Sequence, residues 1–144
     1  VGREPERHLA ELAEQQVVVE RRIDPALPQL LLDPELMRNC IINFVTNGAQ
    51  AMAGGGTLVL GAELDPQQPA WVCLSFTDQG GGIAAEDIEK IFQPYFTTKD
   101  LGIGLGLAIT ERIIKAHGGE ILVTSMLGQG TTFTVRLPME ETEL

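Results

Sequence analysis

The segment TLVLGAELDPQQPAWVCLSFTD, residues 57–78, contains two runs of apolar and β-branched residues separated by the turn sequence DPQQP. Such runs on either side of a proline-containing turn predict a β-hairpin. Along the second run a period of two places three apolar side chains on one face, namely Val72, Leu74 and Phe76. Asp78 falls on that same face, so the sequence predicts an inward-facing carboxylate where the second strand ends.

A helix is expected directly upstream of this hairpin. Asp33-Pro34 supplies an N-cap and a first-turn proline, and three glycines follow the helix from Gly54. The predicted apolar face consists of Met37, Ile41, Phe44, Val45 and Met52. Shorter upstream elements are predicted as a charged helix over 5–16 and strands over 16–23 and 30–33.

Downstream of the hairpin, helix and strand patterns alternate again. A short helix is expected from about Ala85, then irregular chain over 92–104, then a long helix over 105–119 that is closed by two glycines. The segments 120–125 and 131–138 predict a final hairpin around the turn LGQG. This order predicts one α+β domain, a two-layer sandwich in which helices cover one face of a mixed, mostly antiparallel sheet.

Composition narrows the possible partners. The chain has 144 residues, a formal net charge of −10 and 44% hydrophobic residues, which is typical of one globular domain. The acidic balance argues against binding nucleic acid or an anionic lipid surface. No apolar run is long enough to span a membrane, and the N-terminal residues lack a signal-peptide pattern. Cys40 and Cys73 form no disulfide framework, so a reducing compartment is expected.

Glycines and basic residues indicate an anion site in the second half of the chain. Ten of the 16 glycines lie between Gly80 and Gly130, which suggests that backbone approaches another group closely there. GIGLGL, residues 102–107, opens an expected helix whose free N–H groups would bind an anion. It is neither a dinucleotide fingerprint nor a GxxxxGK[ST] phosphate loop. Nearby, Lys99 is the basic residue placed in the irregular stretch, and the other cations are expected on solvated helix faces.

Two polar features each leave two interpretations open. Asn43 and Asn47 share one helix face, where their amides either bond backbone and water or offer oxygens to a cation. Mg²⁺ typically takes only one or two protein oxygens beside phosphate oxygens and waters. Asp78 either forms a turn or accepts from an exocyclic amine such as that of adenine. The turn LGQG followed by Thr131-Thr132 reads, by itself, as an ordinary hairpin.

Taken together, five ordered motifs resemble the ATP-binding domain of bacterial sensor histidine kinases, within the wider GHKL superfamily. They are NFVTNGAQAM (43–52), DQGGGI (78–83), IFQPYFTTK (91–99), GIGLGLAI (102–109) and GQGTTF (128–133). The resemblance covers about residues 5–138 and implies the Bergerat ATP-binding fold. The short lid is similar to that of nitrogen-regulation kinases.

The resemblance implies a role for each matched residue. Asn47 would hold Mg²⁺, while Asn43 would position the phosphates and Asp78 would accept from the adenine amine. Asn43 and Lys99 would take part in transfer of the phosphoryl group, and Phe96 and Lys99 would belong to the lid. The other residues implied in binding ATP are Gln50 beside the phosphates, Gly80, Gly82, Ile83 and Thr132 around adenine, and Gly102, Gly104, Leu105, Gly106 and Leu107 around the triphosphate.

Two residues depart from the family pattern. Gly48 stands where Ala is usual, which should cost the helix about 0.5–1 kcal/mol. Ile103 stands where Thr or Ser is common, so one hydroxyl contact to phosphate is absent.

The resemblance implies transfer of the γ-phosphoryl group of Mg-ATP to a histidine on a separate helical hairpin. The ATPase branches carry a general-base Glu where this chain has Asn43, and an amide cannot act as a base. A hydrolase or Ser/Thr kinase of the same superfamily and a non-catalytic nucleotide-binding module remain alternatives. His117 ends a helix, which favours an imidazolium without a catalytic role.

The acceptor hairpin and the sensor are therefore expected outside this chain. The resemblance implies a homodimeric cytoplasmic parent kinase, with or without a membrane anchor, that passes the phosphoryl group to a response regulator. The domain itself is expected to be a monomer.

Overall fold

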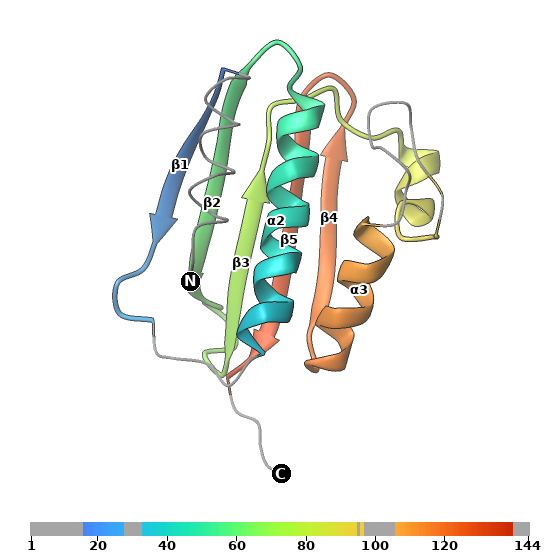
Figure 1. The fold of residues 1–144 in the computed structure, drawn as a ribbon. Coiled ribbons are helices and arrows are strands. Elements are labelled where there is room, and N and C mark those ends of the chain that lie inside the picture. The colour runs from blue at the N-terminus through green and yellow to red at the C-terminus, as the bar shows by residue number, and fades with distance from the viewer. Residues whose placement is uncertain (1–15, 28–32, 95, 97–105, 140–144) are drawn as a thin grey trace.

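The computed structural model describes residues 16–27, 33–94, 96 and 106–139, which form a sheet with helices packed on it (Figure 1). The strands are β1 (Val17–Ile23), β2 (Gly56–Leu64), β3 (Trp71–Thr77), β4 (Glu120–Met126) and β5 (Gly130–Pro138). The helices are α2 (Pro34–Ala51), the 3₁₀ helix η1 (Ala85–Lys90) and α3 (Gly106–Ala116). The predicted helix over 5–16, residues 30–32 of a predicted strand and the tail 140–144 lie outside the described residues.

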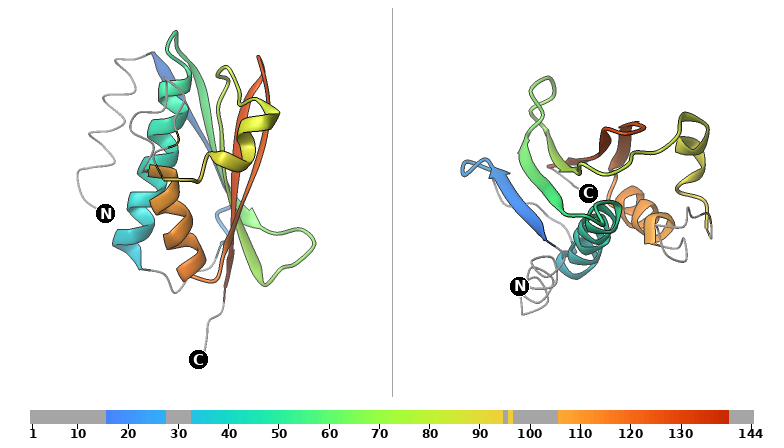
Figure 2. Two further views of the ribbon diagram at one scale, coloured as in Figure 1. Left: turned by 90° about the vertical axis from the view of Figure 1, so that its right-hand side faces the viewer. Right: turned by 90° about the horizontal axis from the view of Figure 1, so that it is seen from above.

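The described strands form a five-stranded sheet in the order β1-β2-β3-β5-β4. β1 runs parallel to β2, and the other neighbouring pairs are antiparallel. The predicted hairpin over 57–78 has Leu60 opposite Phe76, and Phe76 in turn lies opposite Phe133 of β5. The prediction of a mixed, mostly antiparallel sheet in an α+β sandwich is thus confirmed. α2 and α3 lie side by side on one face, as two further views show (Figure 2).

The start of α2 follows from its cap. The Asp33 carboxylate accepts hydrogen bonds from the backbone N–H groups of Glu35 at 3.0 Å and Leu36 at 3.1 Å, as the sequence predicted. The predicted apolar face is wrong at Ile41, which is 37% exposed, whereas Cys40 is buried in its place. Residue spacing gives a helix face only to within one position, because the sheet and α3 contact α2 from different sides.

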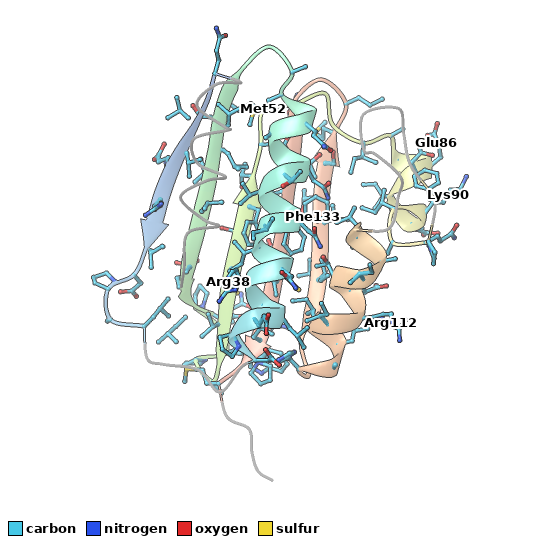
Figure 3. The ribbon with its side chains drawn as sticks, viewed as in Figure 1. Arg38, Met52, Glu86, Lys90, Arg112 and Phe133 are labelled. Atoms are coloured by element: carbon cyan, nitrogen blue, oxygen red, sulfur yellow. The ribbon has the colours of Figure 1, made fainter. Side chains whose placement is uncertain are left out.

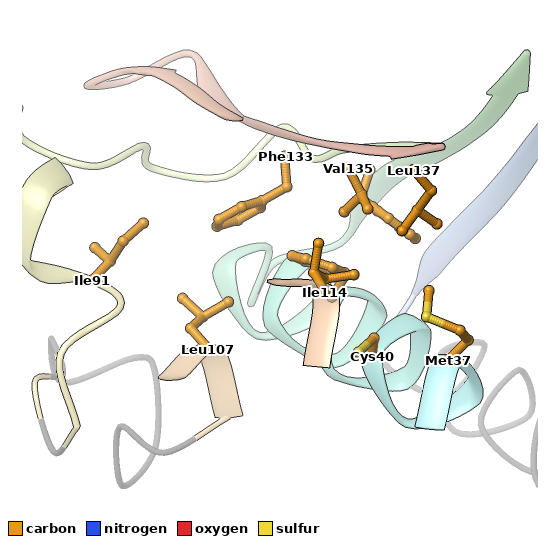
Figure 4. Packing of buried hydrophobic residues seen from close by; sticks show 10 residues of the cluster. Met37, Cys40, Ile91, Leu107, Ile114, Phe133, Val135 and Leu137 are labelled. Carbon is orange, nitrogen blue, oxygen red and sulfur yellow. The ribbon is translucent and has the colours of Figure 1, made fainter. Parts of the chain in front are cut away.

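The main core lies between β3 and β5 on one side and α2 and α3 on the other (Figure 4). Phe44 of α2 stacks on Phe76 with ring centroids 4.6 Å apart, and its ring centroid lies 5.2 Å from that of Phe133. Ile114 of α3 and Leu137 of β5 are fully buried in the same cluster. This packing fixes α3 against α2 and so positions the residues that the sequence placed around a ligand.

The long helix predicted over 105–119 is described as Gly106–Ala116, and it ends where the chain turns through Gly118 with φ +77°. The N–H of Gly119 bonds the carbonyl of Ile114, a helix-ending arrangement that a left-handed glycine allows. None of the described helices has the length and apolarity that a membrane span requires.

Polar side chains from the turn between β2 and β3 and from β4 gather around Arg136 of β5. Its guanidinium donates to Asp65 at 3.0 Å, also pairs with Glu120, and lies 4.7 Å from the ring centre of Trp71. Hydrogen bonds from the Gln67 and Gln68 N–H groups and from Arg136 hold the pKa of Asp65 below its usual value. This network is internally satisfied, so it serves the sheet rather than a ligand.

Candidate functional site

Asp78 follows β3 and is 6% exposed. One carboxylate oxygen, Oδ1, accepts from the N–H of Gly80 at 2.8 Å and from the N–H of Thr131 at 3.2 Å. The other oxygen, Oδ2, receives no hydrogen bond from the described part of the chain. Burial raises the pKa of Asp78, and the two backbone hydrogen bonds offset this rise in part. A buried carboxylate with an oxygen still available is suited to accept a donor from a ligand.

The amides predicted on α2 do not have equivalent surroundings. Asn43 is half-buried, and its Nδ2 donates to the Thr110 hydroxyl at 3.0 Å, with the Gly106 carbonyl oxygen 3.5 Å away. Asn47 is half-buried one turn later, and Gln50 is exposed. α2 therefore brings Asn43 to the first turns of α3, the helix whose N-terminus the sequence predicted as an anion site.

The glycines near Asp78 are required by packing within the chain. An ideal Cβ on Gly80 would lie 2.5 Å from the Ala51 carbonyl oxygen, and one on Gly82 would lie only 2.2 Å from that of Met126. On Gly81 a Cβ would meet nothing within 4 Å. Packing within the protein therefore already requires glycine at Gly80 and Gly82.

Ser125 and Thr131 join the loop after Asp78 to the final hairpin, and sequence reasoning missed both. The Ser125 hydroxyl accepts from the Ile83 N–H at 2.7 Å and lies 2.8 Å from the Thr131 hydroxyl. Thr131 is buried, and its N–H is one of the two donors to Asp78. The sequence did contain a signal for Thr131. It lies two residues before the core side chain Phe133, so alternation along the strand puts it on the same inward face.

Thr132, the predicted member of the adenine pocket, lies on the opposite side of the strand. Its hydroxyl bonds that of Thr77 at 3.0 Å, in the cross-strand pair next to Asp78. Because successive residues of a strand alternate in direction, Thr132 lies on the face opposite Asp78. Thr131 replaces it as the candidate.

Some predicted residues lie elsewhere or outside the described chain. Leu107, expected to line the site, is 7% exposed and belongs to the main core. Phe96 is half-buried against the same core. Lys99, Gly102, Gly104 and Leu105 lie outside the described residues. Lys90 and Arg112 point away from the sheet and helices (Figure 3), as expected for solvated helix faces.

His117 connects the end of α3 to the start of α2. Its Nδ1 lies 2.9 Å from the Ile113 carbonyl oxygen, and its Nε2 lies 3.2 Å from the backbone nitrogen of Asp33. A carbonyl only accepts, so Nδ1 carries the proton and Nε2 accepts from the Asp33 N–H. His117 thus links the end of α3 to the start of α2 through these two backbone contacts.

The described residues contain no group of three or more His, Cys, Asp or Glu side chains that could hold a metal ion.

Comparison with known proteins gives a consistent result. The family model described as "Histidine kinase-, DNA gyrase B-, and HSP90-like ATPase" matches residues 32–141. Sensor histidine kinase ZraS of Escherichia coli K12 is 42% identical over 116 residues, which are 81% of this chain and 24% of that protein. The histidine-protein kinase AtoS of the same organism is 40% identical over 119 residues, 81% of this chain and 19% of that protein. The chain thus spans about a quarter or less of these relatives.

Solved structures agree with this match. The catalytic domain of histidine kinase ThkA, in a nucleotide-free form, has a TM-score of 0.79 at 29% identity, covering 91% of this chain and 86% of that one. Full-length ShkA in complex with AMPPNP has a TM-score of 0.81 at 30% identity, covering 96% of this chain and 30% of that one.

Proposed function

Because the chain belongs to the family of histidine kinase-, DNA gyrase B- and HSP90-like ATPases, we propose that it binds Mg-ATP and donates the γ-phosphoryl group to a histidine on a separate dimerisation domain. The observation that carries the nucleotide assignment is Asp78, a buried carboxylate whose Oδ2 has no donor in the described part of the chain. The similarity to ShkA, solved with AMPPNP, supports an adenine nucleotide as the ligand.

Adenine is bound at Asp78. The exocyclic amine of adenine is a donor, and it bonds Oδ2 while Oδ1 keeps its two backbone partners. Thr131 and Ser125 hold this carboxylate and the Ile83 backbone in fixed relative positions, so the ring meets a preorganised acceptor. Gly80, Gly82 and Ile83 form the loop that borders the ring.

The phosphates lie toward α3, where free N–H groups at the helix N-terminus favour an anion. Asn43 of α2 contacts the first turns of α3, and Asn47 and Gln50 follow it on the same helix. Lys99, Gly102, Gly104, Leu105 and Gly106 complete the proposed site. Mg²⁺ suits this donor set because it takes few protein oxygens and keeps phosphate oxygens and waters. Asn47 supplies an amide oxygen ligand, and the bound ion neutralises phosphate charge.

Transfer is favoured over hydrolysis by the surroundings of Asn43. Its amide nitrogen is already donating to Thr110, and an amide has no basic group to deprotonate a water. Transfer to an external acceptor needs mainly positioning and charge neutralisation, which the N-terminus of α3, the cation and Lys99 supply.

In the parent kinase, the acceptor histidine lies on a helical hairpin that also forms the homodimer, and a response regulator takes the phosphoryl group. The relatives are sensor histidine kinases of which this chain spans about a quarter or less, so the sensor and hairpin belong to the rest of such a protein. This catalytic domain acts as a cytoplasmic monomeric unit without contacting nucleic acid or lipid.

The experiment is to mix the chain with the acceptor hairpin of its parent protein and γ-labelled Mg-ATP. Label should appear on the hairpin histidine, and Asp78→Asn should reduce the rate by weakening nucleotide binding. If the wild-type chain binds Mg-ATP but no phosphohistidine forms, the transfer assignment is overturned. Steady ATP turnover by the chain alone would favour the hydrolase alternative.

A further inference from the structure

Thr110 connects α3 to the amide of Asn43 from inside the protein. It lies one turn after the start of α3 and its exposure is 0%. Its hydroxyl oxygen accepts from Asn43 Nδ2 at 3.0 Å, and the buried thiol of Cys40 on α2 lies close to it. Burial of the Cys40 sulfur raises the pKa of its thiol to about 11, so the thiol stays protonated at neutral pH.

The acceptors around Asn43 determine which end of its amide faces α3. The Gly106 carbonyl, 3.5 Å from Nδ2, can only accept, so the NH₂ group belongs on this side. The Thr110 hydroxyl oxygen, 3.0 Å from Nδ2, is the second acceptor on this side of the amide. These two acceptors therefore hold the NH₂ group of Asn43 toward α3.

The amide oxygen is the group left to act on a ligand. Asn43 Oδ1 receives no hydrogen bond from another described residue, and it would lie 3.7 Å from an ideal Cβ on Gly106, the first residue of α3. An oxygen there accepts and cannot donate, so it suits a cation or a cation-bound water rather than a phosphate oxygen.

We propose that Thr110 is a positioning residue, which holds the Asn43 amide so that Oδ1 rather than Nδ2 faces the cation and phosphates at the start of α3. The inference rests on the proposed function, and it deepens it by placing Asn43 on the cation side of the bound nucleotide. Without the Thr110 hydroxyl the amide can rotate by half a turn and present a donor to the cation.

The test compares Thr110→Val, which removes the hydroxyl at similar volume, with Thr110→Ser, which keeps it. Calorimetry measures the dissociation constant of ATP with and without Mg²⁺ for each, and again in an Asn43→Ala background. NMR of the nucleotide-free chain follows solvent exchange of the Asn43 side-chain NH₂ protons. Thr110→Ala is measured in the same way if the valine variant does not fold.

Thr110→Val should raise the dissociation constant of Mg-ATP by about five- to tenfold and that of Mg-free ATP by less than about twofold. It should speed exchange of the Asn43 NH₂ protons, whereas Thr110→Ser should restore both readouts. In the Asn43→Ala background the valine substitution should have no further effect on affinity, since the interaction is already absent.

An equal loss with and without Mg²⁺, or the same loss when Asn43 is already Ala, would overturn the proposal in favour of a purely structural Thr110. Unchanged NH₂ exchange in Thr110→Val would overturn it as well. Failure of the wild-type chain to bind Mg-ATP would instead refute the proposed function, and the NMR comparison would still test the hydrogen bonds independently.

Discussion

At the scale of single residues, Asp78 combines a structural cost with the recognition role that we propose for it. Burial disfavours its ionised form, yet Oδ1 has two backbone donors and Oδ2 has none in the described part of the chain. Alternation along residues 72–78 was enough to predict that the carboxylate faces inward. The donors from Gly80 and Thr131 depend on the turn after β3 and on the β3–β5 register, neither of which local sequence specifies.

Asp78→Asn should make the folded chain less sensitive to pH. The pKa of Asp78 is raised in the folded state, so its contribution to stability is complete below the ordinary value of 3.8 and falls as the pH rises through the folded-state pKa. Asn keeps an oxygen for the two backbone donors and does not ionise.

Urea unfolding from below pH 3.8 to neutral pH should therefore show wild type losing stability relative to the variant as pH rises. A stability difference that does not change with pH, or that changes in the opposite direction, would show that ionisation of Asp78 carries no folding penalty.

Alanine substitutions at Gly82 and Gly81 compare a tightly packed glycine with a neighbouring glycine in open space. Gly82 has φ +79° and its Cβ would overlap the Met126 carbonyl, so Gly82→Ala should lower the free energy of unfolding by about 1–3 kcal/mol. Gly81→Ala has open space and should change it by less than about 1 kcal/mol. Denaturant titration checks both, and equal effects at the two positions would contradict the packing explanation.

The departure from the family pattern at Gly48 is explained by the residues that surround it. An ideal Cβ there would lie 2.7 Å from Cδ1 of Leu58, a fully buried side chain of β2. Sequence alone suggested only a loss of helix propensity, whereas the structure shows that Leu58 fills the space that an alanine methyl would take.

At the scale of elements, local signals predicted most starts and ends. The cap at Asp33, the glycine stop after α3 and the two hairpins all have short-range causes that can be recognised in sequence. Exposure of Ile41 and burial of Cys40 were not predictable, because they depend on where α3 packs against α2. The hydrogen bond between His117 and the backbone of Asp33 likewise joins residues far apart in sequence.

Removing the cap of α2 tests the element that carries the predicted amides. Asp33→Ala deletes the acceptor for the N–H groups of Glu35 and Leu36, so the free energy of unfolding should fall by about 1 kcal/mol. Asp33→Asn keeps a capping oxygen and should lose less than half of that amount. Urea denaturation of the three chains distinguishes them, and an unaffected Asp33→Ala variant would argue against the cap.

At the scale of the whole molecule, the two layers bring together residues that are distant in sequence. Residues 43 and 110 meet because α2 and α3 pack on one face of the sheet, and residues 78 and 131 meet because β3 pairs with β5. The ordered motifs carry the family resemblance without any of these contacts. The contacts themselves add Thr131, Ser125 and Thr110, whose importance comes only from the assembled fold.

The central claim, that Asp78 recognises the adenine amine, is tested most directly by calorimetry with two nucleotides and two chains. Wild type should bind Mg-ATP more tightly than the Mg-bound triphosphate of purine riboside, which lacks the amine, by about tenfold or more. In Asp78→Asn this preference should disappear, because the donor no longer meets a carboxylate oxygen. A wild-type chain that binds both nucleotides equally, or a variant that keeps the full preference, would contradict the assignment.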